Sequence, residues 1–228
     1  MIRILIADDD AMVRHAIRTM LEAHSDLHVV GEARDGRDAV ALVPRLHPHV
    51  VLMDIRMPHL DGLAATRRIT ATPDGPRVVV LTTFGTSDCI DEALRSGADG
   101  FLVKDTPPFE LAQSVRDVAD GLGVLSPLLS HQVVEIFRRN TSGVGCIDQR
   151  PRSEDLADLS DRERALLSLL VQGQSNREIA SLLHVSEGTV KSHVTRMLKR
   201  FGFDNRVQLA IFASAAGFSA GCGAATGR

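Results

Sequence analysis

Residues 2–10 read IRILIADDD, an apolar run that leads directly into three carboxylates. Such a run is typical of a strand buried on both faces of a parallel sheet. Similar runs occur at residues 28–33, 50–53, 78–81 and 100–103, and segments of helical periodicity occur between or after them at residues 11–23, 36–45, 61–70, 87–96 and 107–120. Five alternations of strand and helix predict a doubly wound α/β domain with a five-stranded parallel sheet over residues 1–122.

Polar side chains follow the predicted strands at the points where the strands end. Asp8 and Asp9 follow the first strand, Asp54 the third, Thr82 the fourth and Lys104 the fifth. Ligands of doubly wound sheets bind beyond the carboxyl ends of the strands, so these groups should converge. Clustered carboxylates repel one another unless a hard cation such as Mg²⁺ neutralises them. A lysine and a hydroxyl beside the metal could bind a transferring phosphoryl group, with one carboxylate as the nucleophile.

Each of these residues also has a plainer interpretation. Asp9 or Asp10 could cap the helix that begins at residue 11, and for Asp10 the cap is the favoured role. A single Lys104 could be a solvated or ion-paired surface lysine, and Thr82 could bond only to the backbone. The combination at the ends of four strands is what favours a site.

Four motifs carry a resemblance to a known family. Residues 4–9 (ILIADD), 52–58 (LMDIRMP), 81–83 (LTT) and 100–105 (GFLVKD) together resemble the receiver domain of two-component response regulators, which has a flavodoxin-like fold. The resemblance implies that Asp54 accepts a phosphoryl group from a sensor histidine kinase.

The resemblance also implies roles for the surrounding residues. Mg²⁺ would be held by Asp9 directly, by Asp8 through water, by Asp54 and by the backbone carbonyl of Arg56. Thr82 and Lys104 would contact the phosphoryl oxygens. Phe101 matches the switch aromatic of the family, although a plain core residue is an equal alternative.

The charge of the chain changes sign between its two ends. Residues 1–122 hold 13 basic and 19 acidic side chains, whereas residues 160–228 hold 9 basic and 5 acidic ones. An acidic first part suits a cation, and a basic second part suits a polyanion. Residues 123–155 are predicted to be a linker with a helix at 128–139, and residues 217–228 a disordered tail.

Residues 156–216 show only helical patterns and predict a small all-α domain of four helices. Ser160 and Glu163 fit a capping box at the first helix. The second helix is expected at 176–183, the third from its N-cap Ser186 to residue 201, and the fourth at 205–215.

The third helix has two unlike faces. Val190, Val194, Met197 and Leu198 share one face, and the opposite face carries Lys191, Ser192, Thr195 and Lys199. Such a polar face can enter the major groove of DNA. The alternative is a helical bundle whose basic face is merely solvated.

A second resemblance favours DNA binding. Residues 159–163 (LSDRE), 173–180 (GQSNREIA) and 189–193 (TVKSH) resemble the LuxR-type helix-turn-helix, so the whole chain resembles the NarL/FixJ family of response regulators. This resemblance implies that bases are contacted by Lys191, Ser192 and Thr195. Phosphate contact or orientation of the helix is implied for Ser175, Asn176, Thr189, His193, Lys199 and Arg206, with a buried helix–helix hydrogen bond as the alternative for His193.

The expected function is therefore a DNA-binding transcription regulator, switched by Mg²⁺-dependent phosphorylation of Asp54 and able to form a homodimer on phosphorylation or DNA binding. The fourth helix resembles the one that dimerises in this family. The partners implied are double-stranded DNA and a sensor histidine kinase. With three scattered cysteines, no secretory signal and no apolar run of membrane-spanning length, we expect a cytoplasmic protein with no membrane partner.

Two rival functions are weighed. The first is a DNA-binding regulator that is never phosphorylated and uses its receiver for dimerisation or ligand sensing. The second is an enzyme, a Mg²⁺-dependent phosphatase with an aspartyl nucleophile, because residues 8–10 contain an Asp-x-Asp pattern. Met12 stands where such enzymes usually have Thr or Val, so we expect no enzyme.

Overall fold

The computed structural model describes residues 1–72, 75–83, 92, 96–126, 158–203 and 206–218. The chain divides into two compact units, Met1–Val124 and Leu125–Arg228. The predicted helix at 128–139, the rest of the linker and most of the tail lie outside the described residues, as does most of the helix expected at 87–96. Among the described helices, none is both long and apolar enough to cross a membrane.

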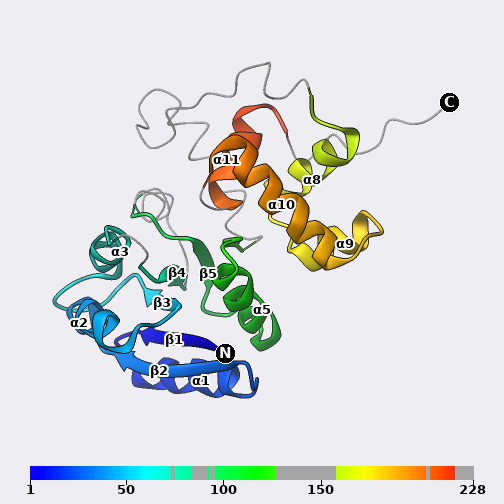
Figure 1. Cartoon of the computed structure of the whole chain (residues 1–228). Coiled ribbons are helices and arrows are strands. Elements are labelled where there is room, and N and C mark those ends of the chain that lie inside the picture. Colours follow the sequence, from blue (N-terminus) through cyan, green and yellow to red (C-terminus); the bar gives the residue numbers. More distant parts are fainter. Residues whose placement is uncertain (73–74, 84–91, 93–95, 127–157, 204–205, 219–228) are drawn as a thin grey trace. The chain divides into compact units, whose positions relative to one another are not determined.

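The first unit is built on a parallel sheet. Its strands are β1 (Ile2–Ala7), β2 (Leu27–Ala33), β3 (Val50–Asp54), β4 (Arg77–Thr82) and β5 (Gly100–Val103) (Figure 1). A short β6 (Val124–Leu125) lies beside β5. The strand order is β2-β1-β3-β4-β5-β6, and the pairings among the first five strands are parallel. The predicted five-stranded parallel sheet is confirmed, and the order of those strands is the flavodoxin-like one.

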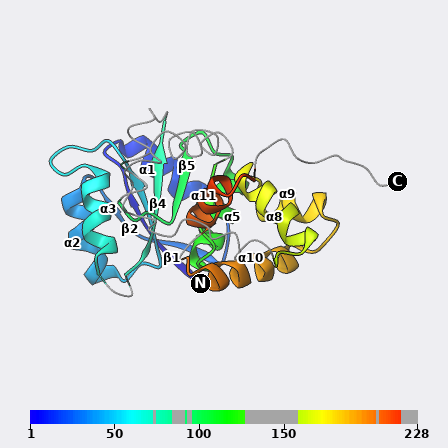
Figure 2. The ribbon, with the colours of Figure 1, turned by 90° about the horizontal axis from the view of Figure 1, so that it is seen from above.

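Two helical layers cover the sheet because alternate strand residues point to opposite faces. Ile4 and Ile6 pack in one core cluster with α1 (Ala11–Glu22) and α5 (Pro108–Ala119). Leu5 and Ala7 pack in the other with α2 (Gly36–Leu46) and α3 (Gly62–Thr70). Figure 2 shows α2 and α3 together on one side of the sheet. Strands buried on both sides explain the solid apolar runs of the sequence.

An aspartate caps each of the first three helices at the edge where the strands end. The carboxylate of Asp10 accepts a hydrogen bond from the N–H of Met12 at 2.8 Å, so the cap predicted for Asp10 is confirmed. Asp35 and Asp61 cap α2 and α3 in the same way. The cap uses the Asp10 side chain to satisfy one N–H of the first turn of α1 that has no partner within the helix.

From residue 158 onward, the regular elements that the structure describes in the second unit are all helices. Its helices are α8 (Asp161–Val171), α9 (Asn176–Leu182), α10 (Glu187–Phe201) and α11 (Arg206–Ala215). The capping box of Ser160 and Glu163 is confirmed, and Ser186 caps α10. Gly202 ends α10 with a φ of 71°, a left-handed conformation that glycine adopts without strain. These residues mark where α8 begins and where α10 begins and ends.

Candidate functional site

The predicted acidic residues come together at the carboxyl edge of the sheet. Asp8 follows β1, Asp54 is the last residue of β3, and Lys104 follows β5. Because these strands run parallel in one sheet, their carboxyl ends lie at the same edge. Asp8 is fully buried and Asp54 is 6% exposed, whereas Asp9 is exposed. The site thus has a buried floor and one carboxylate at its mouth.

Lys104 connects the two buried carboxylates. Its Nζ lies 2.7 Å from Asp8 Oδ2 and 3.1 Å from Asp54 Oδ2. Burial raises the pKa of Asp54 above its ordinary value and the charge of Asp8 adds to this, while Lys104 opposes it. Burial alone would lower the pKa of Lys104, but the hydrogen bonds to both carboxylates outweigh it and raise that pKa. One ammonium therefore faces two carboxylates, so the floor of the site retains a negative charge.

The same carboxylates fit a divalent cation. One carboxylate oxygen from each of Asp8, Asp9 and Asp54 lies within 4.8 Å of the other two. Mg²⁺ prefers such hard oxygen ligands and commonly takes one or two carboxylates together with water. Arg56 lies two residues beyond Asp54 with its side chain exposed, and its carbonyl stays a predicted ligand.

Thr82 and Phe101 complete the predicted set. Thr82 is the buried last residue of β4, and its carbonyl accepts a hydrogen bond from the N–H of Lys104 at 2.8 Å. Phe101 is buried on β5, opposite Val80 of β4. Burial of Phe101 agrees with both predicted roles, so its function as a switch stays a prediction.

Sequence reasoning missed two residues that shape this edge. At Gly62, the first residue of α3, a Cβ atom would lie 1.8 Å from the carbonyl oxygen of Asp54, so only glycine lets the helix start against the end of β3. The signal for it was a glycine directly after the N-cap Asp61. Arg14, on α1, hydrogen-bonds to the carbonyls of Asp8 and Asp9. Its signal was an arginine on the helix directly behind the acidic loop.

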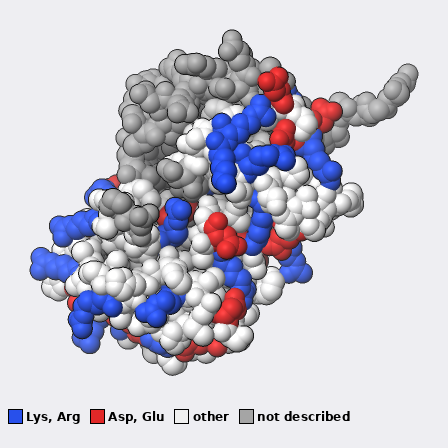
Figure 3. All heavy atoms as spheres, in the orientation of Figure 1, with Lys and Arg blue, Asp and Glu red and all other residues white. Residues whose placement is uncertain are grey.

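The polar face predicted for the third helix of the second unit is present on α10. Ser192, Thr195 and Lys199 are exposed and Lys191 is half-buried. The apolar face is buried, as predicted, through Val190, Val194, Met197 and Leu198. Figure 3 shows Lys and Arg side chains gathered where Figure 1 places α10. The helix therefore offers hydroxyl and cationic groups to a polyanion.

The residues predicted for phosphate contact or helix orientation divide into two groups. Asn176 is 1% exposed and Arg206 5% exposed. Arg206 donates from Nη1 to Asn176 Oδ1 at 3.2 Å and from Nη2 to the carbonyl of Gln174 at 2.7 Å. Buried polar groups bonded in this way hold helices together, so the structure favours the orienting role for this pair.

The other candidates of this set lie nearer the surface. Ser175 is exposed, and its hydroxyl accepts a hydrogen bond from the N–H of Glu178 as the cap of α9. The Thr189 hydroxyl lies 2.8 Å from that of Ser186. His193 is half-buried, and its Nδ1 lies 2.7 Å from Nη2 of Arg196 on the same helix. That guanidinium also pairs with Glu163 on α8, so His193 is linked to a second helix through Arg196.

Comparison with known proteins gives a consistent result for both units. Residues 4–116 match the family described as response regulator receiver domain, and residues 157–213 match the family described as bacterial regulatory proteins, luxR family.

Full-length relatives share this organisation. The transcriptional regulatory protein LnrK of Bacillus subtilis is 37% identical over 219 residues, which is 96% of this chain and 99% of that protein. The nitrate/nitrite response regulator protein NarL of Escherichia coli K12 is 33% identical over 209 residues, with 92% and 93% covered. The crystal structure of the response regulator ChrA in a heme-sensing two-component system is 34% identical and matches with a TM-score of 0.52, covering 95% of this chain and 98% of that one.

Proposed function

We propose that Asp54 accepts a phosphoryl group and that this event controls DNA binding by α10, because this chain belongs to the NarL/FixJ family of two-component response regulators. The family regulates transcription through a receiver and a LuxR-type DNA-binding domain. The observation that carries the proposal is the contact of Lys104 with both Asp54 and Asp8, in a group of three carboxylates.

The proposed chemistry uses Asp54 as the nucleophile. A carboxylate oxygen of Asp54 attacks the phosphorus of a phosphohistidine on a sensor kinase and forms an O–P bond. The P–N bond of the donor breaks, and its electron pair leaves with the histidine nitrogen. Mg²⁺, held by Asp8, Asp9, Asp54 and the carbonyl of Arg56, would supply charge neutralisation for the phosphoryl oxygens.

Lys104 and Thr82 would respond to the new group. The ammonium of Lys104 already lies beside Asp54, so it can pair with a phosphoryl oxygen as soon as Asp54 carries one. Thr82 supplies a hydroxyl at the end of the neighbouring strand. A change at this edge would shift the receiver between two states, and Phe101 is the proposed switch residue.

The proposed DNA contacts are those on the exposed face of α10. Lys191, Ser192 and Thr195 would contact bases, and Lys199 would contact a phosphate together with Ser175, Thr189 and His193. Paired half-sites bound by a homodimer would add avidity, because the second contact becomes intramolecular. We propose α11 as the dimerising helix, on the strength of the family resemblance.

Intact-mass measurement tests the phosphoacceptor. The full chain and Asp54→Ala are incubated with Mg²⁺ and a small phosphodonor. We expect one added phosphoryl group on the wild-type chain only. No adduct with any donor would favour the regulator that is never phosphorylated, and steady turnover of a phosphate ester would favour the phosphatase.

Duplex DNA binding at several salt concentrations tests the second unit. Affinity should fall steeply with salt because each phosphate contact releases counterions. Binding that is independent of salt would exclude docking of α10 in the groove.

Sedimentation of the phosphorylated and unphosphorylated chain, with and without DNA, tests the homodimer.

A further inference from the structure

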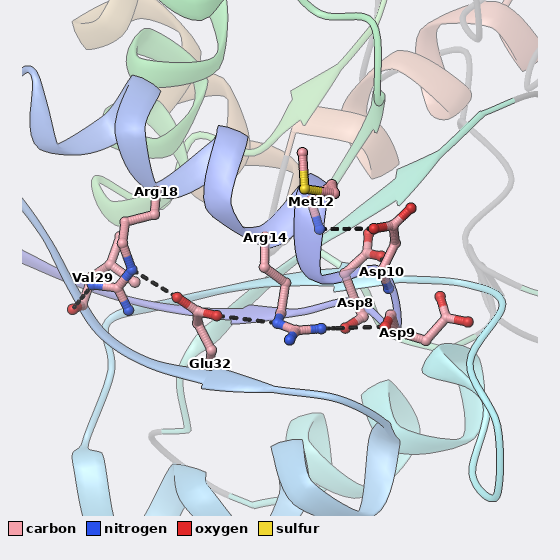
Figure 4. Close-up of polar contacts among 8 residues, drawn as sticks. All are labelled: Asp8, Asp9, Asp10, Met12, Arg14, Arg18, Val29 and Glu32. Carbon is pink, nitrogen blue, oxygen red and sulfur yellow. Dashed lines mark hydrogen bonds and ion pairs between the residues drawn. The ribbon is translucent and has the colours of Figure 1, made fainter.

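Arg14 is a largely buried cation directly behind the acidic loop. Its side chain is 11% exposed, and it extends from α1 toward the loop that carries Asp8 and Asp9 (Figure 4). Nη1 donates to the carbonyl of Asp8 at 2.8 Å and to the carbonyl of Asp9 at 3.3 Å. One guanidinium nitrogen thus holds two successive carbonyls of the segment that supplies two of the three carboxylates.

Glu32 on β2 fixes the other end of this guanidinium. Arg14 Nε lies 3.1 Å from Glu32 Oε2, and the second oxygen of Glu32 pairs with Nε of Arg18 at 2.7 Å. Burial alone would raise the pKa of Glu32, but the two guanidinium groups outweigh it and hold that pKa below its ordinary value. Glu32 therefore stays ionised, and the planar fork of Arg14 has its orientation set by β2.

Two further polar groups of the loop also have hydrogen-bond partners. The N–H of Asp8 donates to the carbonyl of Ala33 at 3.2 Å, and Oδ1 of Asp8 accepts from the N–H of Asp10 at 2.9 Å. The two loop carbonyls would otherwise need solvent or a different loop conformation. An ordinary surface ion pair would consist of the contact with Glu32 alone. Arg14 also bonds to two backbone carbonyls, so its contacts exceed those of such a pair.

We propose that Arg14, oriented by Glu32, is a positioning residue for cation binding, which acts by holding the backbone of the Asp8–Asp9 loop in the conformation that gathers the carboxylates. This inference rests on the proposed function, because it concerns the same Mg²⁺ site. Outer residues that orient metal ligands typically contribute about 10–100-fold to metal affinity.

The direction in which loss of Arg14 changes Mg²⁺ affinity distinguishes a positioning role from a purely electrostatic one. Arg14 is a cation close to a cation site, so its charge alone disfavours Mg²⁺. Removing that charge would tighten Mg²⁺ binding if electrostatics were its only influence. Removing a positioning residue should weaken binding instead, because the carboxylates lose their fixed arrangement.

The experiment measures the Mg²⁺ dissociation constant of the full chain by competition with Mn²⁺, whose free form is counted by electron paramagnetic resonance. We expect Arg14→Ala to weaken Mg²⁺ binding about 10-fold or more. Arg14→Lys should not restore it, because an ammonium cannot span Glu32 and two carbonyls. Glu32→Gln should weaken it by a smaller factor. Should Arg14→Ala fail to fold, Arg14→Lys carries the test, because it keeps the positive charge and removes the guanidinium contacts.

Arg18→Ala is the matched control. Arg18 shares Glu32 with Arg14, but its other hydrogen bonds go to Glu22 and to the carbonyl of Val29, away from the acidic loop. Removal of Arg18 should leave the Mg²⁺ dissociation constant within about twofold of the wild-type value, because substitutions away from a functional site usually have effects no larger than this. Unchanged or tighter binding in Arg14→Ala, or equal losses in Arg14→Ala and Arg18→Ala, would overturn the inference.

The wild-type chain separates this inference from the proposed function. A wild-type chain that neither binds Mg²⁺ nor gains a phosphoryl group removes the proposed function, and the inference falls with it. A wild-type chain that does both, beside an Arg14→Ala variant with undiminished affinity, removes only the role of Arg14.

Discussion

The three lysines of the chain fall into two settings that contrast the two units. Lys104 is 14% exposed and contacts two buried carboxylates within its own unit. Lys191 and Lys199 both lie on α10, where Lys199 is exposed. A buried cation acts on charges that the fold brings together, whereas an exposed one acts on a partner from solution. Substitutions at the acidic site should therefore change stability and chemistry together, and substitutions on the face of α10 should change affinity alone.

Lys104→Ala should show the largest effect. It leaves Asp8 and Asp54 buried without their shared cation, and breaking a buried pair in this way costs about 3–5 kcal/mol of unfolding free energy. Loss of a preorganised group at the phosphoryl oxygens should also slow phosphorylation by about 10²–10³. Urea unfolding and intact-mass kinetics measure the two effects.

Mg²⁺ and Lys199→Ala serve as the controls for Lys104→Ala. Added Mg²⁺ should return part of the lost stability, because a cation again neutralises the carboxylates. Lys199→Ala should change stability by less than about 0.5 kcal/mol. Equal destabilisation by both alanine variants would remove the contrast between the two lysines.

Arg206→Ala tests the same contrast inside the second unit. It leaves Asn176 buried without this donor, which should lower the unfolding free energy by about 1–3 kcal/mol. The exposed Lys199 should behave in the opposite way: Lys199→Ala should reduce the salt dependence of DNA affinity by about one phosphate contact with little change in stability.

Chemical unfolding and salt-dependent DNA binding, measured on both variants, separate these outcomes. An Arg206→Ala variant that keeps wild-type stability but loses one unit of salt slope would restore Arg206 as a phosphate contact.

The acidic site could be predicted from the sequence because a parallel sheet brings the carboxyl ends of its strands to one edge. Asp8, Asp54 and Lys104 are far apart in the chain, but each directly follows or ends an apolar run, so the topology alone brings them together. The cap formed by Asp10 was predictable for a similar reason, since it depends on residues only two positions apart.

Contacts that depend on packing between distant segments could not be predicted. Asn176 and Arg206 are polar residues at helix starts, where a DNA contact and a buried hydrogen bond use the same residue types. Their burial depends on how α11 packs beside the start of α9, 30 residues earlier. The approach of Gly62 to Asp54 likewise depends on the angle at which α3 leaves the sheet.

Asp54→Asn should stabilise the metal-free protein. Because burial raises the pKa of Asp54, its ionised form is disfavoured in the fold relative to the unfolded chain. The penalty is present at pH values above the folded pKa and disappears as the pH falls through it. The stability gained by Asp54→Asn over the wild-type protein should therefore be seen at neutral pH. It should decrease in acid and also with added Mg²⁺.

Thermal unfolding across pH, with and without Mg²⁺, measures this advantage. The exposed Asp105, next to Lys104, provides the control, and Asp105→Asn should leave stability unchanged. A metal-free Asp54→Asn variant that is less stable than wild type at neutral pH would contradict the electrostatic description of the site.

The smallest effect is expected from Glu163→Gln, which affects an N-terminal cap rather than a buried pair. Glu163 accepts hydrogen bonds from the N–H and the hydroxyl of Ser160 and pairs with Arg196. The N–H of Ser160 is the main cause that lowers the pKa of Glu163 below its ordinary value of 4.5. The ionised carboxylate therefore stabilises the fold above that ordinary value, and this stabilisation is lost as the pH falls through the lowered pKa.

Glutamine keeps the acceptor oxygen and removes the charge at the start of α8, so Glu163→Gln should lower stability by about 0.3–1 kcal/mol near neutral pH. The difference from wild type should vanish in acid. Glu178→Gln changes the same kind of capping box on α9 and serves as the matched variant. A larger loss at Glu163 than at Glu178, measured by urea unfolding at neutral pH and again in acid, would assign the excess to Arg196. Because Arg196 belongs to α10, that excess would measure how far the cap of one helix also holds the helix proposed to bind DNA.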